Sequence, residues 1–265
     1  MRSRIVTALG LAVLLIAALF YASPRVTAVI LGAVLAVGVW EWSAFLAVAL
    51  PWRVLYVLLL IGLGVLGQRY SLNPSAYVIA MQVALAWWLA ALVWLIWAPT
   101  YVTRTMAALA GIVTLLPTWI ALVRIDATFP AGARWTLFIL ALAFGTDTGA
   151  FFAGRAFGRL PLAPRVSPHK TWEGVLGGML LALAVAVAGA VWFRQPMVRF
   201  VALCLAAAAF SVVGDLTESM LKRHVNLKDS GRLFPGHGGV LDRIDSVTAA
   251  TPVMALGLVW LGAGR

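Results

Sequence analysis

The chain has 265 residues, of which 63% are hydrophobic and only 11% are charged, and its formal net charge is +11. A soluble domain carries about a quarter charged residues, so this composition excludes a water-soluble globular protein. The single cysteine, Cys204, excludes a disulfide scaffold within the chain. Because the apolar runs are continuous rather than alternating, we expect an all-α, polytopic membrane bundle and not a β-barrel.

About nine apolar runs approach the roughly 20 residues that a helix needs to cross the core of a bilayer. In chain order they cover residues 5–21, 26–50, 55–66, 76–97, 106–123, 135–153, 174–193, 198–213 and 246–261. The third run is short, so eight spans remain an alternative. The first run resembles a signal peptide, but it is long and further spans follow, so we interpret it as the first span.

The distribution of Lys and Arg predicts the orientation, because cytoplasmic loops carry an excess of both residues. The N-terminus and the loops after spans 2, 4, 6 and 8 hold 13 of the 20 basic residues, and the alternate set of segments holds 7. We therefore expect the N-terminus and the long polar loops, 154–173 and 214–245, to be cytoplasmic.

Acidic residues and lysines gather late in the chain. Seven of the nine acids and all three lysines lie between Asp147 and Asp245. This pattern fits either hydrated loops or a polar site for an anionic substrate. Asp147 itself lies inside an apolar run, where an ionised carboxylate has a function or, as the alternative, a structural salt bridge. Glu41, between Trp40 and Trp42, is expected to pair with an arginine.

The end of the eighth span carries a polar stripe at helical spacing, so we expect a helix that leaves the membrane. The stripe consists of Ser211, Asp215, Glu218, Ser219 and Lys222. For Glu218 we favour a solvated i,i+4 ion pair with Lys222. Asp215 lies at the edge of the apolar run, where a carboxylate is rare and has a partner.

A glycine-rich segment follows at residues 228–239, with Gly231, Gly236, Gly238 and Gly239. Exposed backbone N–H groups and nearby basic side chains can hold phosphate there, and a plain connector is the alternative. Neither the P-loop spacing nor the dinucleotide fingerprint is satisfied.

Asp242 and Asp245 share one side of the start of the last span. They either cap this helix or, with Asp215, bind a hard cation such as Mg²⁺. Zinc is disfavoured because the three histidines are dispersed. The segment 167–173 predicts a helix start, and the small residues between 149 and 178 predict close helix packing.

These motifs together resemble the phosphatidate cytidylyltransferase family. The resemblance rests on Ser219, Lys222-Arg223, Lys228-Asp229, Gly231, Phe234-Pro235, His237-Gly238-Gly239 and Asp242-Arg243-Ile244-Asp245. Two upstream segments and the polytopic architecture are also similar, namely Ser167-Pro168-x-Lys170-Thr171-Trp172-Glu173-Gly174 and Gly214-Asp215-Leu216.

The resemblance implies that CTP and phosphatidic acid react to give CDP-diacylglycerol and pyrophosphate, with Mg²⁺ and with a second, monovalent cation left open. It implies a multi-pass enzyme of the bacterial inner membrane, with a cytoplasmic site, a homodimeric assembly and no nucleic-acid partner. We expect a single membrane domain over 1–265, with mainly scaffold spans in 1–134 and catalytic spans in 135–265.

The site residues follow from the resemblance and from the chemistry of joining two polyanions, which needs cations to neutralise and align them. The catalytic assignments are Asp242, Asp245, Lys222, Lys228 and His237. The substrate-binding assignments are Arg223, Arg243, Lys170, Gly236, Gly238, Gly239 and Asp229. The metal assignments are Asp215, Asp242, Asp245 and Asp147.

Two other functions fit part of this pattern. A transporter or channel explains the spans and the buried acids, but not the gathering of acids and lysines at one end. A CDP-alcohol phosphotransferase requires Asp-x-x-Asp-Gly followed by Asp-x-x-x-Asp, and neither half of that pattern fits this sequence.

Overall fold

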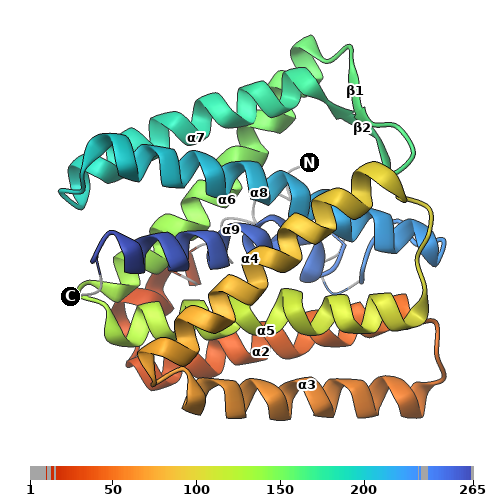
Figure 1. Ribbon diagram of the computed structural model, residues 1–265, viewed down its shortest axis with the longest axis horizontal. Coiled ribbons are helices and arrows are strands. Elements are labelled where there is room, and N and C mark those ends of the chain that lie inside the picture. Colours follow the sequence, from red (N-terminus) through yellow and green to blue (C-terminus); the bar gives the residue numbers. More distant parts are fainter. Residues whose placement is uncertain (1–9, 11–12, 15, 232, 234–237, 264–265) are drawn as a thin grey trace.

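The computed structural model describes residues 10, 13–14, 16–231, 233 and 238–263. Within them the chain forms a bundle of long helices and one short hairpin (Figure 1). The elements are α2 (Pro24–Trp42), the 3-10 helix η1 (Ser43–Leu46), α3 (Leu50–Tyr70), α4 (Pro74–Trp97), α5 (Arg104–Thr128), α6 (Gly132–Phe157), β1 (Pro161–Ala163), β2 (Ser167–Thr171), α7 (Trp172–Trp192), α8 (Met197–His224) and α9 (Leu241–Trp260).

The prediction of an all-α, polytopic membrane bundle is confirmed. Seven helical segments among the described residues are long and apolar enough to cross a membrane, namely α2 with η1 and then α3 to α8. Of the first predicted span, 5–21, the structure describes residues 10, 13–14 and 16–21, and all of these are helical. The third span is not short, because α3 runs for 21 residues, so the reason for counting eight spans disappears.

Polar residues and prolines begin several of these helices. The Ser23 side chain accepts a hydrogen bond from the N–H of Val26, and Pro24 occupies the first turn of α2. Asn73 caps α4 in the same way, with Pro74 directly after it. Such residues satisfy N–H groups that have no partner within the helix, and proline has no N–H to satisfy.

Helix α9 lies at the centre of the bundle rather than at its edge. Every residue from Ser246 to Leu258 is buried, and α9 contacts α2, α4, α5, α6 and α8. The Thr118 hydroxyl on α5 donates to the Thr248 carbonyl oxygen at 2.9 Å. A helix that is apolar on all sides is a buried helix. The predicted span 246–261 is therefore helical, but it is enclosed by protein and is not among the seven candidate spans.

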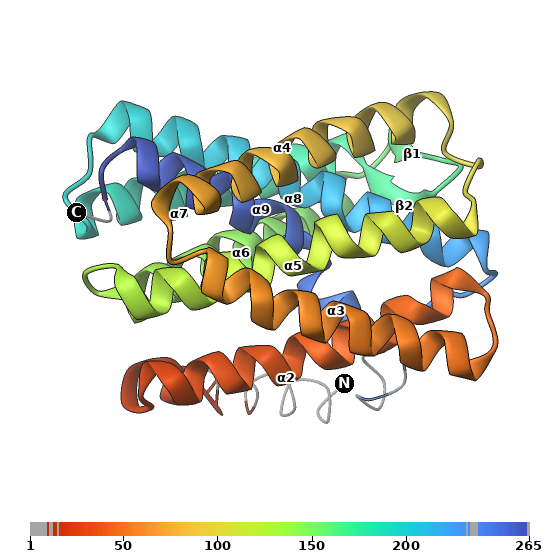
Figure 2. The ribbon, with the colours of Figure 1, turned by 60° about the horizontal axis from the view of Figure 1, so that its bottom comes forward.

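The connections alternate between the two ends of the bundle (Figures 1 and 2). The α2–α3 and α4–α5 connections, the hairpin after α6 and the end of α8 lie at one end. The α3–α4, α5–α6 and α7–α8 connections and the end of α9 lie at the other. This arrangement agrees with the two sets of segments predicted from the spans. We call the first of these the charged end.

Helices α6 and α7 pack closely through small residues, as the sequence predicts. A Cβ added at Gly149 would lie 2.6 Å from the Gly177 carbonyl oxygen, and one at Gly178 would lie 2.7 Å from that of Thr146. Backbone therefore meets backbone along this helix pair, and even an alanine at Gly149 or Gly178 would push the helices apart.

The predicted loop 154–173 contains structure that the sequence reading missed. Its first residues complete α6, and β1 and β2 then form an antiparallel hairpin that pairs Pro161 with Thr171. The predicted helix start within 167–173 is confirmed, because α7 begins at Trp172, but the five residues before it form β2, which was not predicted. Thr171 caps α7, and its hydroxyl oxygen accepts from the Gly174 N–H at 3.1 Å.

Candidate active site

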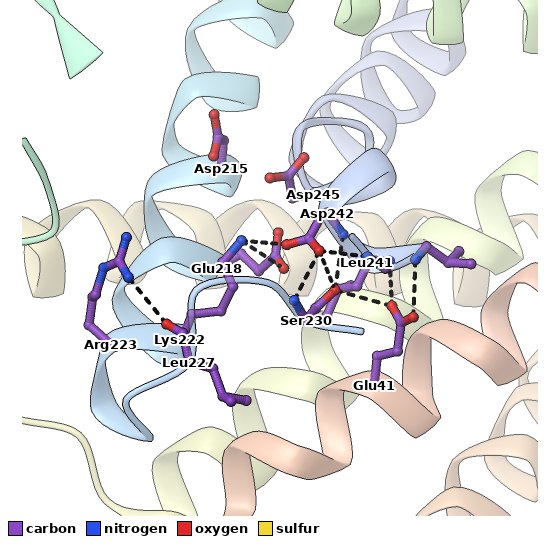
Figure 3. A network of polar contacts seen from close by, with 12 residues as sticks. Glu41, Asp215, Glu218, Lys222, Arg223, Leu227, Ser230, Leu241, Asp242 and Asp245 are labelled. Carbon is purple, nitrogen blue, oxygen red and sulfur yellow. Dashed lines mark hydrogen bonds and ion pairs between the residues drawn. The ribbon is translucent and has the colours of Figure 1, made fainter. Parts of the chain in front are cut away.

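Lys222 on α8 lies between two carboxylates, and we call these three residues the Lys222 triad (Figure 3). Its Nζ is 2.6 Å from Asp242 Oδ1 and 3.3 Å from Glu218 Oε1. The predicted i,i+4 pair is confirmed, but its predicted solvation is wrong, because the Glu218 side chain is only 2% exposed. The cause is α9, which packs so tightly on α8 that a Cβ at Gly214 would lie 2.6 Å from the Asp245 carbonyl oxygen.

Asp242 organises the chain that precedes α9. Its Oδ2 accepts hydrogen bonds from the Ser230 N–H at 2.9 Å, the Ser230 hydroxyl at 2.9 Å and the Gly239 N–H at 2.8 Å. Burial alone would raise the pKa of Asp242, but the Lys222 ammonium and these N–H groups hold the pKa below its usual value. Oδ2 is therefore fully occupied, and a metal could reach Asp242 only through Oδ1, beside the Lys222 ammonium.

A second group of carboxylates comes from three helices. Asp147 on α6 accepts a hydrogen bond from the Ser246 hydroxyl at 2.7 Å, and Asp215 on α8 forms an ion pair with Lys170 of β2. Figure 3 shows Asp215 and Asp245 on facing turns of α8 and α9, next to the Lys222 triad. The charge of Asp215 acts on both Asp147 and Asp245.

The donor set of this second group fits a hard cation, which prefers carboxylate oxygens. Glu218 adds a buried carboxylate that pairs with Lys222 and interacts with the Asp245 carboxyl. In the described part of the chain, however, no three His, Cys, Asp or Glu side chains are grouped so that they could hold a metal ion. A complete site therefore requires side-chain rotation, starting with the release of Asp215 from Lys170.

A cavity of about 530 Å³ opens between α6, the hairpin, α7 and α8. Its polar lining includes Asp147, Arg155, His169, Lys170 and Asp215. Its apolar lining includes Ala150, Phe151, Leu162, Val175 and Val212. A space lined by both charged and apolar groups suits an amphipathic molecule with a charged head group.

Glu173 holds the hairpin in place beside this cavity. Its carboxylate accepts hydrogen bonds from the N–H groups of Arg159 at 3.1 Å and Leu160 at 3.2 Å. The chain between α6 and β1 is thereby tied to the first turn of α7. This connection fixes the hairpin that presents Lys170 and His169.

The remaining predicted residues are more scattered. Arg223 donates to the Leu227 carbonyl oxygen at 3.2 Å, and Lys228 and Asp229 are exposed. Arg243 is exposed, and its charge acts on Asp147. Gly238 has a φ of +80° and lies so close to Asp242 that a Cβ would sit 2.6 Å from Oδ2. Gly236 and His237 lie outside the described residues.

Glu41 has partners that the sequence did not indicate. It accepts hydrogen bonds from backbone N–H groups at the start of α9, and no arginine among the described residues forms an ion pair with it. The nearby Arg53 guanidinium instead lies 4.6 Å from the centre of the Trp40 ring. Because buried carboxylates inside apolar runs are rare, the rule that singled out Asp147 should have singled out Glu41 as well.

Known proteins are similar to this chain over nearly its whole length, which includes both the scaffold helices and the charged end. Residues 2–261 match the model of a family described as the cytidylyltransferase family. The chain is 36% identical over 282 residues to the phosphatidate cytidylyltransferase of Haemophilus influenzae, which covers 95% of this chain and 96% of that protein. It is 39% identical over 268 residues to that of Pseudomonas aeruginosa, covering 98% and 97%. The chain belongs to the phosphatidate cytidylyltransferase family.

Membership of this family confirms the resemblance found in the sequence. A third relative, the phosphatidate cytidylyltransferase of Bacillus subtilis, is 38% identical over 125 residues, which is 46% of each chain. The two longer matches extend beyond the signature residues to the whole chain, including α2, which carries Glu41.

Proposed function

We propose that the charged end of the bundle is where this phosphatidate cytidylyltransferase joins CTP to phosphatidic acid, forming CDP-diacylglycerol and pyrophosphate. The observation that carries this assignment is the position of Asp215, Glu218 and Lys222 on one face of α8. Asp215 lines the amphipathic cavity, and Lys222 binds the segment before α9 through Asp242. The lipid and nucleotide regions therefore meet along two turns of one helix.

The reaction needs little general acid–base catalysis from the protein. A phosphate oxygen of the lipid attacks the α-phosphorus of CTP, the bond from that phosphorus to the bridging oxygen breaks, and pyrophosphate leaves. The phosphate monoester is already mostly ionised near neutral pH, with a second pKa of about 6, so it needs no general base. The task is to bring two polyanions together in line.

The chain's own cations suit this task. We assign Lys170 and Arg155 of the cavity to the lipid phosphate, and the apolar cavity wall to the adjoining acyl chains. We assign Lys222, Lys228 and Arg243 to the phosphates of CTP, with Arg223 and Asp229 at the rim. Gly236 and Gly238 stay predicted contacts of the nucleotide through backbone N–H groups, whereas the Gly239 N–H already donates to Asp242. His237 stays a predicted aid to the departure of pyrophosphate.

Asp147, Asp215 and Asp245 are the residues that we expect to hold Mg²⁺, with Glu218 beside them. When bound, the ion would neutralise phosphate charge where it develops. Asp242 stays a predicted ligand, but its present bonds favour a role in organising the site. A second, monovalent cation stays a prediction as well.

The metal assignment predicts a shifted Mg²⁺ requirement. We expect Asp215→Asn to raise the half-saturating Mg²⁺ concentration of CDP-diacylglycerol synthesis by about 10- to 100-fold, because a ligand would be lost. Mg²⁺ titration of the purified variant measures this shift. Asp126→Asn, near the opposite end of α5, is the matched control and should titrate like the wild type. An unshifted titration of Asp215→Asn would contradict the assignment.

The reaction itself is tested on the purified protein in detergent. We expect pyrophosphate release only when CTP, phosphatidic acid and Mg²⁺ are all present, together with a CDP-lipid that mass spectrometry can identify. ATP, GTP and UTP serve as controls for the nucleotide, and diacylglycerol serves as a control for the lipid phosphate. A folded protein that releases no pyrophosphate under these conditions would contradict the proposal.

We place this site on the cytoplasmic side of the bacterial inner membrane, because the charged end holds the larger set of basic residues and CTP is a cytoplasmic metabolite. Helix α8 spans about 26 Å from Met197 to Gly214 at 1.5 Å per residue, nearly the thickness of a bilayer core. The carboxylates from Asp215 onward would then lie at the membrane interface, where both substrates can reach them. A homodimer stays a prediction.

A further inference from the structure

Glu41 connects the scaffold half of the chain to the segment before α9, which we call the signature loop (residues 228–240). We infer that Glu41 is a positioning residue that holds the two ends of the signature loop together and so shapes the CTP-binding segment. This inference rests on the proposed function, because it takes the signature loop to bind CTP.

The contacts of Glu41 reach both ends of the signature loop (Figure 3). Its Oε1 accepts a hydrogen bond from the Val240 N–H at 3.1 Å, and its Oε2 accepts one from the Leu241 N–H at 2.7 Å. Ser230 Oγ, near the other end, lies 3.2 Å from Oε2. Glu41 is only 5% exposed, so these bonds form where little water competes for them.

Two glycines of the signature loop leave room for this carboxylate. A Cβ added at Gly231 would lie 2.7 Å from Glu41 Cδ, and one added at Gly239 would lie 2.6 Å from the same atom. Real Cβ atoms do not approach a carbon this closely, so an alanine at either position would displace the loop or Glu41. These two glycines therefore have a packing role that is independent of any contact with phosphate.

Glu41 is itself held firmly by the scaffold. Val39 and Trp42, on either side of it, are buried, and the Trp42 indole N–H donates to the Ala107 carbonyl oxygen at 2.9 Å. The carboxylate also lies at the N-terminus of α9, where negative charge is favourable. The scaffold thus supplies a fixed anchor for the signature loop.

A chain of polar contacts continues from this anchor to the triad. The single proton of the Ser230 hydroxyl lies between Glu41 Oε2 at 3.2 Å and Asp242 Oδ2 at 2.9 Å, and it can be donated to only one of them at a time. Asp242 in turn binds Lys222 at 2.6 Å. Through Ser230 and Asp242, Glu41 thereby acts on Lys222, which we assign to the CTP phosphates.

Glu41→Gln tests the inference with almost no change of volume. The glutamine amide puts an NH₂ donor where the carboxylate accepts from Val240 or Leu241, so a donor faces a donor. We expect the KM for CTP to rise at least about tenfold, because the binding segment is no longer pre-formed, while the KM for phosphatidic acid changes less than about twofold. We also expect faster hydrogen exchange in peptides that contain Val240 and Leu241.

Two further variants make this result specific. Thr27→Val removes a buried hydroxyl from the same helix, whose partner is the Ala18 carbonyl oxygen, and it should leave both KM values and loop exchange unchanged. Glu41→Asp keeps the charge on a shorter side chain and should recover part of the CTP affinity.

The inference is overturned if Glu41→Gln keeps the wild-type KM for CTP in an active enzyme. It is also overturned if Glu41→Gln and Thr27→Val lose activity toward both substrates equally, because Glu41 would then be merely structural. An inactive wild type would contradict the proposed function instead. Hydrogen exchange would still decide whether Glu41 holds the loop.

Discussion

Asp242→Asn is expected to lower kcat/KM for CDP-diacylglycerol synthesis by about 1,000-fold or more while the protein stays folded in the membrane. Asp242 accepts from Lys222 through one oxygen and from Ser230 and Gly239 through the other. An asparagine must place its NH₂ group toward one of these two sets of donors. Either the Lys222 ammonium or the closing turn of the signature loop would then lose its acceptor.

Asp126→Asn again supplies the matched control, because it makes the same chemical change near the opposite end of the bundle. Steady-state synthesis of CDP-lipid gives kcat/KM, and elution from a size-exclusion column in detergent reports whether each variant is folded. An Asp242→Asn protein with Mg²⁺-dependent activity close to that of the wild type would show that Asp242 neither organises the site nor holds metal.

Much of the helical architecture was predictable because it depends on local sequence. A long apolar run by itself indicates a membrane helix, and the bounds of α4 and α7 lie within two residues of the predicted runs. The polar stripe from Ser211 to Lys222 was also predictable, because it needs only the period of a helix. The two sets of alternating connections follow from the order of these spans.

Burial at the charged end was not predictable from local spacing. The spacing of Glu218 predicts a surface ion pair, but α9 covers this side chain. The composition of α9 predicts an ordinary membrane span, but five other helices surround it. The hairpin gave a weak signal as well, because strands of three and five residues are too short to show a period. Each of these features depends on contacts between distant segments.

Glu41 shows the same limit most clearly. Its partner Leu241 is 200 residues away along the chain, and nothing in the segment Trp40–Trp42 indicates which distant N–H groups the carboxylate will meet. The glycines Gly231 and Gly239 correctly indicated an irregular loop. They did not indicate that the Glu41 carboxylate, from another helix, occupies the space where a Cβ at either position would lie.

Removing Lys222 is expected to affect both stability and activity, because this ammonium compensates two carboxylates that are at most 10% exposed. Lys222→Met should lower the free energy of unfolding by about 3–5 kcal/mol, the usual effect of leaving a buried charge without its partner. It should also lower kcat/KM at least about 1,000-fold, since a cation that we assign to the CTP phosphates is lost. Thermal unfolding in detergent and CDP-lipid synthesis measure the two effects.

The double variant Lys222→Met with Glu218→Gln separates these two roles. Without Lys222, Asp242 keeps three donors, whereas the buried Glu218 keeps only the neighbouring Asp245 carboxyl among the described residues, so Glu218 should account for most of the lost stability. Neutralising Glu218 should therefore restore much of the unfolding temperature but none of the activity. If both were restored together, the lysine would serve only to balance a buried charge, and the assignment of Lys222 to the phosphates of CTP would be wrong.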